Sequence, residues 1–164
     1  LRLELQQVLW CNIQDRVNFF CWIFGSQYFA PFINQRLLEL VETQVVDNKV
    51  LVLTANELDL VHCFFKCRMP QYISKIDFLG ADYLSGVPPM KGISKRIALQ
   101  KYIKDQNLPL TIKKHCFFDS VSDLELAEIC DIKIGIGKYK LRKIRKISYD
   151  VLSYDDYCKV LKND

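Results

Sequence analysis

Apolar residues recur at helical spacing in the first quarter of the chain. From residue 3 to residue 24 they appear every three or four positions, which is typical of an amphipathic helix. Pro31 ends or bends that segment. A second amphipathic helix is predicted over residues 34–44, with Asn34 as its N-cap. The sequence therefore predicts two helices before any strand.

The pattern changes after the Asp47-Asn48 turn. Residues 50–53 form a continuous β-branched and aliphatic run, which indicates a strand covered on both faces, as in a parallel sheet. A helix is predicted from Glu57 to about Lys66. Strand and helix patterns then alternate to the end of the chain. Strands are predicted within 72–86, 115–119 and 131–137, with a short segment at 149–152, and helices over 94–106, 123–130, 139–147 and from 154 onward.

This alternation predicts an α/β fold. Alternating elements favour a parallel sheet with right-handed crossovers and helices on both of its faces. Ligands of such sheets bind at the carboxyl ends of the strands. The positions of interest are therefore Thr54, Asp119 and the loop over residues 135–138.

Composition favours a folded intracellular domain. Half of the residues are hydrophobic and 26% are charged, a balance that excludes disorder. The seven cysteines stand singly in apolar contexts, without metal-ligand spacing. The favoured interpretation is free thiols in a reducing cytoplasm.

The net charge of +4 arises mostly from one basic run. Residues 133–146 hold seven lysines and arginines. Such a run can attract anions toward a phosphate site, or it can be the solvated face of a helix whose apolar stripe is Leu141, Ile144 and Ile147. We favour the second interpretation and predict no nucleic-acid binding.

The start of the chain has no signal-peptide pattern, and Leu1 is not an initiator methionine. Residues 19–33 are the most apolar stretch, but polar residues and Pro31 interrupt it and it is shorter than a spanning helix. We expect a buried or cap-forming helix there. Contact with a membrane surface or a lipid-like substrate remains open and is not predicted.

Three short motifs carry candidate chemistry. Thr54 ends a strand and precedes a helix, so its hydroxyl faces an anion site at a helix N-terminus, or it is an ordinary cap. Lys91 follows a proline pair and precedes Gly92 at a helix start, where its ammonium can meet a phosphate, or it is an exposed loop lysine. Asp119 and Asp123 are one helical turn apart after a buried strand. Two such carboxylates suit Mg²⁺, or residues of this segment simply cap the next helix.

Taken in order, "LVLTAN", "MKGISKRIAL" and "FFDSVSDLELAE" resemble the second, third and fourth motifs of the haloacid dehalogenase-like (HAD) phosphatases. The likeness is greatest to phosphoserine-phosphatase-type members and to similar domains fused to some membrane prenyltransferases. It covers about residues 34–149. The resemblance implies a three-layer sandwich with a mainly parallel sheet (a Rossmannoid core) over residues 34–164. It also implies a helical cap-like segment over residues 1–33.

The resemblance also implies residue roles. Thr54 would hydrogen-bond the transferring phosphoryl group, and Lys91 would neutralise the charge around it. Asp119 would bind Mg²⁺ and Asp123 would support the metal shell. The substrate would be a phosphorylated small molecule, and the aromatic residues of the cap-like segment would suit an apolar tail, although core packing explains them equally well.

One motif of the family is missing. The chain contains no Asp-x-Asp, the motif that supplies the nucleophile and the general acid. Phe118 also stands where the family usually has glycine. We expect an enzyme truncated at its N-terminus, or a natural protein that has lost catalysis, and little or no phosphatase activity in either case. The alternative is a non-catalytic interaction module on the same scaffold. Another doubly wound fold is a weaker option, because residues 135–138 lack P-loop spacing.

Overall fold

The computed structural model describes residues 35–82, 85–148 and 150–160. The predicted cap-like segment and Asn34 lie outside this range. The chain divides into two compact units, residues 1–90 and residues 91–164, and each is described by itself. The division falls between Met90 and Lys91, shortly after Pro88 and Pro89.

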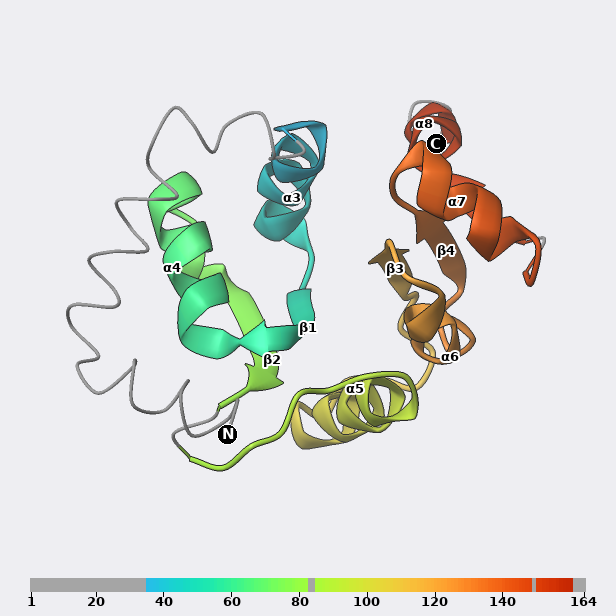
Figure 1. The fold of residues 1–164 in the computed structure, drawn as a ribbon. Helices are drawn as coiled ribbons and strands as arrows, with labels where there is room; N and C mark the ends of the chain where they lie inside the picture. The colour runs from blue at the N-terminus through green and yellow to red at the C-terminus, as the bar shows by residue number, and fades with distance from the viewer. Residues whose placement is uncertain (1–34, 83–84, 149, 161–164) are drawn as a thin grey trace. The chain divides into compact units, whose positions relative to one another are not determined.

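The first unit contains a parallel strand–helix–strand arrangement (Figure 1). Its strands pair in parallel, with Val50 opposite Ile76 and Leu53 opposite Leu79. Parallel neighbours need a crossover, and the helix between the two strands supplies it. In chain order the elements are α3 (Gln35–Asp47), β1 (Val50–Glu57), α4 (Leu58–Arg68), the short 3-10 helix η2 (Ile73–Lys75) and β2 (Ile76–Ala81).

The core of the first unit lies between one face of this strand pair and the two helices. Alternate strand residues share a face, so the strand residues that pack into the core come from one side of the pair. Burial of this apolar surface is the main stabilising contribution of the unit. The buried members are Leu38, Val45, Phe65, Met69 and Ile76, with Val50, Val52 and Phe78 packed against them.

β1 is longer than the sequence predicts. It extends to Glu57, and its pairing with β2 shifts between Leu53 and Glu57. Between these two pairs β1 advances by four residues and β2 by two. The extra residues of β1 are absorbed without ending the ladder, so the strand extends past the aliphatic run and the helix starts at Leu58.

The second unit contains a three-stranded parallel sheet in the order β3-β4-β5. His115 pairs with Ile132, and Ile134 pairs with Leu152. The elements are α5 (Ile93–Asp105), β3 (His115–Phe118), the 3-10 helix η3 (Val121–Asp123), α6 (Leu124–Ala127), β4 (Ile132–Gly135), α7 (Lys138–Arg145), β5 (Leu152–Ser153) and α8 (Tyr154–Val160).

Helices contact both faces of this sheet. On one face, the ring of Tyr157 from α8 packs edge-on against His115 and Phe117. On the opposite face α7 lies close to β4, since a Cβ at Gly135 would come within 2.5 Å of the Leu141 side chain. Glycine is therefore needed at position 135 for the helix to approach this closely.

The α/β class and the parallel pairing of the strands are confirmed. The helices and strands predicted from residue 34 onward are present, with changed bounds, and α6 is much shorter than the predicted helix. The three-layer arrangement around one sheet stays a prediction, since the described strands form a two-stranded and a three-stranded sheet.

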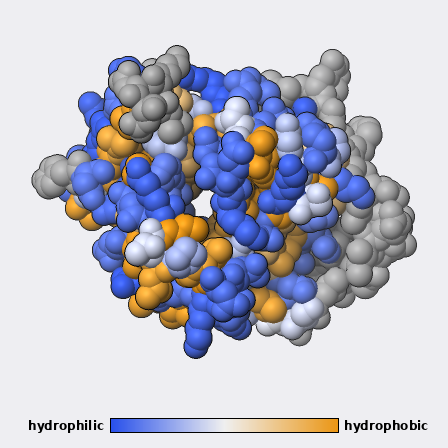
Figure 2. Space-filling model, turned by 180° about the vertical axis from the view of Figure 1, so that it is seen from behind, coloured by the Kyte–Doolittle hydropathy of each residue, from blue (hydrophilic) through white to orange (hydrophobic). Residues whose placement is uncertain are grey.

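The surface of the described residues is mixed in polarity. Figure 2 shows apolar patches between hydrophilic ones on the face that it presents. Large apolar side chains that stay exposed include Ile93, Ile97 and Leu110. Within the described ranges, no helix combines the length and the apolar character needed to cross a membrane.

Candidate functional site

The start of α5 is held by a glycine and a serine. Gly92 precedes the helix with φ of 52°, a conformation that side chains disfavour. A Cβ there would lie 2.8 Å from a carboxylate oxygen of Glu125, so the helix start lies close to α6. The hydroxyl of Ser94 accepts from the backbone N–H of Lys91 and donates to its carbonyl, each at 2.8 Å. The first turn of α5 is therefore fixed next to the acidic segment, residues 119–125, which follows β3 and carries Asp119, Asp123 and Glu125.

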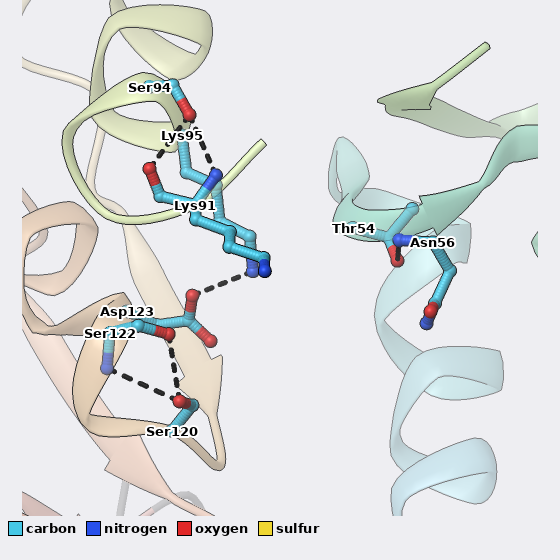
Figure 3. Close-up of polar contacts among 8 residues, drawn as sticks. All are labelled: Thr54, Asn56, Lys91, Ser94, Lys95, Ser120, Ser122 and Asp123. Atoms are coloured by element: carbon cyan, nitrogen blue, oxygen red, sulfur yellow. Dashed lines mark hydrogen bonds and ion pairs between the residues drawn. The ribbon is translucent and has the colours of Figure 1, made fainter. Parts of the chain in front are cut away.

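A buried ion pair joins α5 to that acidic segment (Figure 3). The ammonium of Lys95 lies 2.7 Å from Oδ1 of Asp123, and both side chains are 11% exposed. The two residues are 28 positions apart in the sequence. Charged groups are rarely buried unless they are paired, because desolvation costs several kcal/mol per ion, on the order of the pairing energy itself.

The turn between β3 and α6 shapes the surroundings of this pair. The hydroxyl of Ser120 accepts from the backbone N–H of Ser122 at 3.3 Å and shares a hydrogen bond with its hydroxyl at 2.8 Å. Ser120 therefore caps η3, as one of the two interpretations of this segment predicts. Asp123 makes no side-chain cap, although it precedes α6. Its carboxylate is directed to Lys95 instead.

Asp119 and Asp123 differ in environment. Asp119 follows β3 and is exposed, whereas Asp123 is buried. The sequence correctly places both residues after a strand. Among the described residues, no group of three or more histidine, cysteine, aspartate or glutamate side chains is positioned to hold a metal ion. Binding of Mg²⁺ by Asp119 and Asp123 remains a prediction.

Lys95 contacts the turn after β3 through its ion pair with Asp123, and the phosphate-neutralising role of Lys91 stays a prediction. Lys91 is exposed, and within the described part of the chain its ammonium makes no ion pair. Figure 3 shows both lysines extending from the start of α5 toward the turn that carries Ser120, Ser122 and Asp123. The sequence marked Lys91 because it precedes glycine. Lys95 was missed because a charged residue inside a helical pattern is normally solvated, and only its partner 28 residues later distinguishes it.

Thr54 lies within β1 in the first unit and forms local contacts. Its Oγ1 accepts from the backbone N–H of Asn56 at 3.0 Å, and a Cβ at Gly80 would lie 2.7 Å from its methyl group. The following helix begins with Glu57 as N-cap and Asp59 in its first turn, and these carboxylates oppose an anion there. The role of Thr54 in binding phosphate, and its convergence with the three residues of the second unit, stay predictions.

Two cysteine thiols of the second unit have shifted pKa values. The hydrogen bond between Cys116 and Cys130, followed by burial, raises the pKa of the Cys116 thiol far above its usual range, and the negative charge of Asp123 adds to the rise. The same hydrogen bond lowers the pKa of Cys130, with Lys114 acting in that direction and burial opposing it.

Comparison with known proteins identifies no relative of this chain. No family model, no curated protein and no solved structure matches this chain.

Proposed function

We propose that this chain is a phosphatase-type domain of the HAD-like class, with the three-layer core of that class, and that it binds phosphomonoesters. The phosphate-binding edge would lie where the end of β3 meets the start of α5. The observation that carries this proposal is the buried ion pair between Lys95 and Asp123 beyond the carboxyl end of β3.

The pair supports a binding role because a buried ion pair usually stabilises a fold no better than apolar residues in the same place. Replacing a buried ion pair by well-packed apolar residues is often neutral or stabilising by about 1–4 kcal/mol. A buried charge pair at the carboxyl end of a parallel strand is therefore a candidate for function. In this interpretation Asp123 holds the Lys95 ammonium in a poorly solvated place, where it can turn toward an incoming phosphate.

Other groups of the second unit suit the same anion. The Lys91 ammonium is exposed, the hydroxyls of Ser120 and Ser122 are hydrogen-bonding groups on the facing turn, and the N-terminus of α5 carries a partial positive charge. Lys95 would take the charge-neutralising role that the family resemblance assigned to Lys91, and Lys91 would add attraction at the entrance.

Mg²⁺ fits the chemistry of the two carboxylates but would find few protein ligands. Asp119 and Asp123 offer oxygen atoms, which this hard ion prefers, and one oxygen of Asp123 is bound to Lys95. Asp119 and the second oxygen of Asp123 would hold the ion, which would supply further neutralisation of phosphate charge. Asp119 would be the principal ligand.

Turnover is not expected from this polypeptide. No Asp-x-Asp is present in its sequence, and phosphoryl transfer through an aspartyl intermediate requires that carboxylate in line with phosphorus. The second candidate function, a non-catalytic interaction module, is favoured by this absence and by the exposed basic residues Arg142 and Lys143 on α7. The apolar substrate tail depends on residues 1–33, outside the described range, and a cytoplasmic location stays a prediction.

A binding experiment tests the proposal. Thermal unfolding of the full chain is followed with inorganic phosphate, with Mg²⁺ and with both, because a ligand that binds only the folded state raises the Tm. We expect phosphate to raise the Tm, and Lys91→Ala to weaken that effect. Lys101→Ala removes the same charge from an exposed position farther along α5 and should leave the effect unchanged. Asp119→Asn should abolish any additional effect of Mg²⁺.

Three outcomes distinguish the hypotheses. A Tm unaffected by phosphate, or an equal loss in the Lys91 and Lys101 variants, contradicts a phosphate site at this edge. Stabilisation by phosphate without any effect of Mg²⁺ supports binding without the metal chemistry of the family. Hydrolysis of an aryl phosphate with Mg²⁺ that depends on Asp119 would show that the chain contains a nucleophile outside the Asp-x-Asp pattern.

A further inference from the structure

The basic residues of α7 do not all lie on one face of the helix. Leu141 fills the Cβ position of Gly135 at 2.5 Å and Ile144 is fully buried, so the side of α7 that carries them is turned to β4. Arg145 is held by the chain that follows, because its Nε donates to the carbonyl of Val151 at 3.0 Å. Residues three and four positions apart share a face of a helix, so three exposed cations lie away from the sheet. This outward face is formed by Arg142, Lys143 and Lys146.

The outward face ends in an exposed apolar side chain. Ile147 directly follows Lys146 and lies four residues after Lys143. Its backbone N–H donates to the carbonyl of Ile144 at 2.9 Å, which fixes its place at the end of the helix. The side chain of Ile147 is nevertheless 63% exposed. A basic surface with an aliphatic group at its edge is therefore presented to the surroundings.

Neighbouring carboxylates do not neutralise this surface. Residues 132–149 contain no aspartate or glutamate. The carboxylates that flank this stretch are paired with other lysines, Asp131 with Lys114 and Asp150 with Lys133. Within the described ranges, no carboxylate forms an ion pair with the first or the last cation of the outward face. The positive charge of the outward face is thus available to an anionic partner.

We propose that the outward face of α7, together with Ile147, is a docking surface for a bilayer that contains anionic phospholipids. The three cations lie at the level of the headgroups, where the negative surface potential attracts them. The side chain of Ile147 enters the boundary between headgroups and acyl chains, as apolar residues of interfacial helices do. This docking surface goes beyond the phosphate site at the start of α5 and does not depend on it.

A bilayer fits the four side chains better than a nucleic acid does. The phosphates of a nucleic acid would satisfy the cations, but the exposed aliphatic side chain of Ile147 would remain in water. Single strands gain affinity by stacking their bases on aromatic rings, which isoleucine lacks. A phospholipid surface offers phosphate groups for the cations and apolar chains directly below them, so every side chain of the surface finds a complementary group.

The expected binding is weak, reversible and dependent on salt. Each basic residue near an anionic surface raises the partition coefficient about fivefold. Dissolved salt screens this attraction, whereas the contribution of an inserted apolar side chain does not require charge. Loss of charge and loss of the apolar group are therefore separable by mutation.

Vesicle sedimentation of the full chain tests the proposal. The chain is mixed at low ionic strength with vesicles of phosphatidylcholine alone or of phosphatidylcholine and phosphatidylserine in equal amounts. We expect binding to the mixed vesicles only, and release on addition of salt. Arg142→Gln/Lys146→Gln should lower the partition coefficient about 25-fold, the product of two fivefold effects. Ile147→Ser should lower it at unchanged net charge.

Two control variants match these changes elsewhere in the second unit. Lys101→Gln/Lys104→Gln removes the same charge from exposed positions of α5, and Leu110→Ser removes an aliphatic side chain that is 91% exposed. Both should retain binding to the mixed vesicles. The Tm of every variant should equal that of the unchanged chain, because the substituted side chains are exposed.

Three results would overturn the proposal. The first is absence of binding to the mixed vesicles, or equal binding to phosphatidylcholine alone. The second is an equal loss in the two double variants, which would assign the attraction to net charge and not to α7. The third is displacement of the chain from vesicles by a short DNA duplex that binds Ile147→Ser as tightly as the unchanged chain, which would assign the outward face to nucleic acid.

Discussion

The ends of β1 and β3, which the sequence marks as candidate sites, are built from different kinds of contact. Within β1, three residues before its end at Glu57, Thr54 accepts a hydrogen bond from a backbone N–H two residues away, and its methyl group packs on Gly80. At the end of β3, Asp123 reaches a lysine 28 positions earlier in the sequence. The first arrangement is local and shaped by packing, whereas the second is long-range and charged. Similar sequence patterns near the end of a strand can thus have either a structural or a chemical role, and the group that the side chain contacts distinguishes the two.

The largest expected effect tests the charged arrangement. Lys95→Met leaves the buried carboxylate of Asp123 unpaired, and breaking such a pair costs about 3–5 kcal/mol. The double variant Lys95→Met/Asp123→Leu should recover most of that loss, because both charges are then removed. Urea unfolding of the full chain gives the free energies of unfolding. Arg96→Met is the control, because its pair with Glu128 is 3.4 Å long and exposed and such pairs contribute about 0–1 kcal/mol. Equal losses of stability in Lys95→Met and Arg96→Met would show that the buried ion pair behaves like an exposed one.

The packed arrangement at the end of β1 is tested by Gly80→Ala. The new methyl would lie 2.7 Å from Thr54 Cγ2 and 3.0 Å from the carbonyl oxygen of Asn56, and overpacking costs about 1–3 kcal/mol. Thr54→Ser removes the clashing methyl and keeps the hydroxyl that accepts from Asn56. Combined with Gly80→Ala, it should recover part of the loss in urea unfolding. No recovery would show that the methyl of Thr54 is not the limiting contact.

The start of α5 is expected to tolerate substitution less well than an open turn. Gly92→Ala places a side chain at φ of 52°, which costs about 1–2 kcal/mol for the left-handed backbone alone, and also brings Cβ to 2.8 Å from Glu125. Gly86 has φ of 74°, and among the described residues no atom lies within 4 Å of its Cβ position, so Gly86→Ala measures backbone strain without the contact. Urea unfolding should show a larger loss for the Gly92 variant. The reverse order would mean that α5 does not begin against α6.

The smallest expected effect is a pH dependence at the opposite face of the second sheet. Burial, followed by the charge of Lys113, lowers the pKa of His115 below its ordinary value of 6.5, while Asp131 acts against the shift. The unfolded chain therefore takes up a proton at a higher pH than the folded chain does. The stabilisation is fully present above pH 6.5 and is lost as the pH falls through the lower pKa of the folded state.

A variant of His115 separates its contribution to the pH dependence from that of other groups. His115 Nδ1 lies 2.7 Å from the hydroxyl of Tyr157, and protonation of the ring leaves Nδ1 only the donor role in this hydrogen bond. His115→Gln should flatten the dependence of the unfolding free energy on pH below 6.5, the ordinary pKa of the histidine side chain. Cys158→Ser, on the same helix as Tyr157, should leave that dependence in place. An unchanged slope in the glutamine variant would assign the effect to other groups.

The sequence predicted the order of elements better than their ends. The aliphatic run at residues 50–53 and the short run at residues 115–118 are strands because their composition leaves few alternatives. The extension of β1 to Glu57 was not predictable, because an irregularity in pairing depends on the partner strand. α6 is short mainly at its end: it stops at Ala127, where Ile129 and Cys130 bond to carbonyls three residues back, as in a turn.

Of the buried ion pair at the candidate site, the sequence predicted the aspartate but not the lysine. Asp123 follows a recognisable strand, so its placement could be read from the chain. Lys95 has no local signal, because its burial is produced by tertiary packing of α5 against the turn after β3.

The glycine at position 135 has an evolutionary consequence. Leu141 occupies the space of a side chain there and Ile144 is fully buried, so close packing at these two residues sets how α7 lies on β4. The positive charges of Arg142 and Lys143 are therefore displayed at fixed spacing from a rigid support. A mutation that adds even one methyl group at residue 135 would lift or turn this helix and reorient all of its charges at once, so change at a site without a side chain can alter the electrostatic pattern of a whole surface.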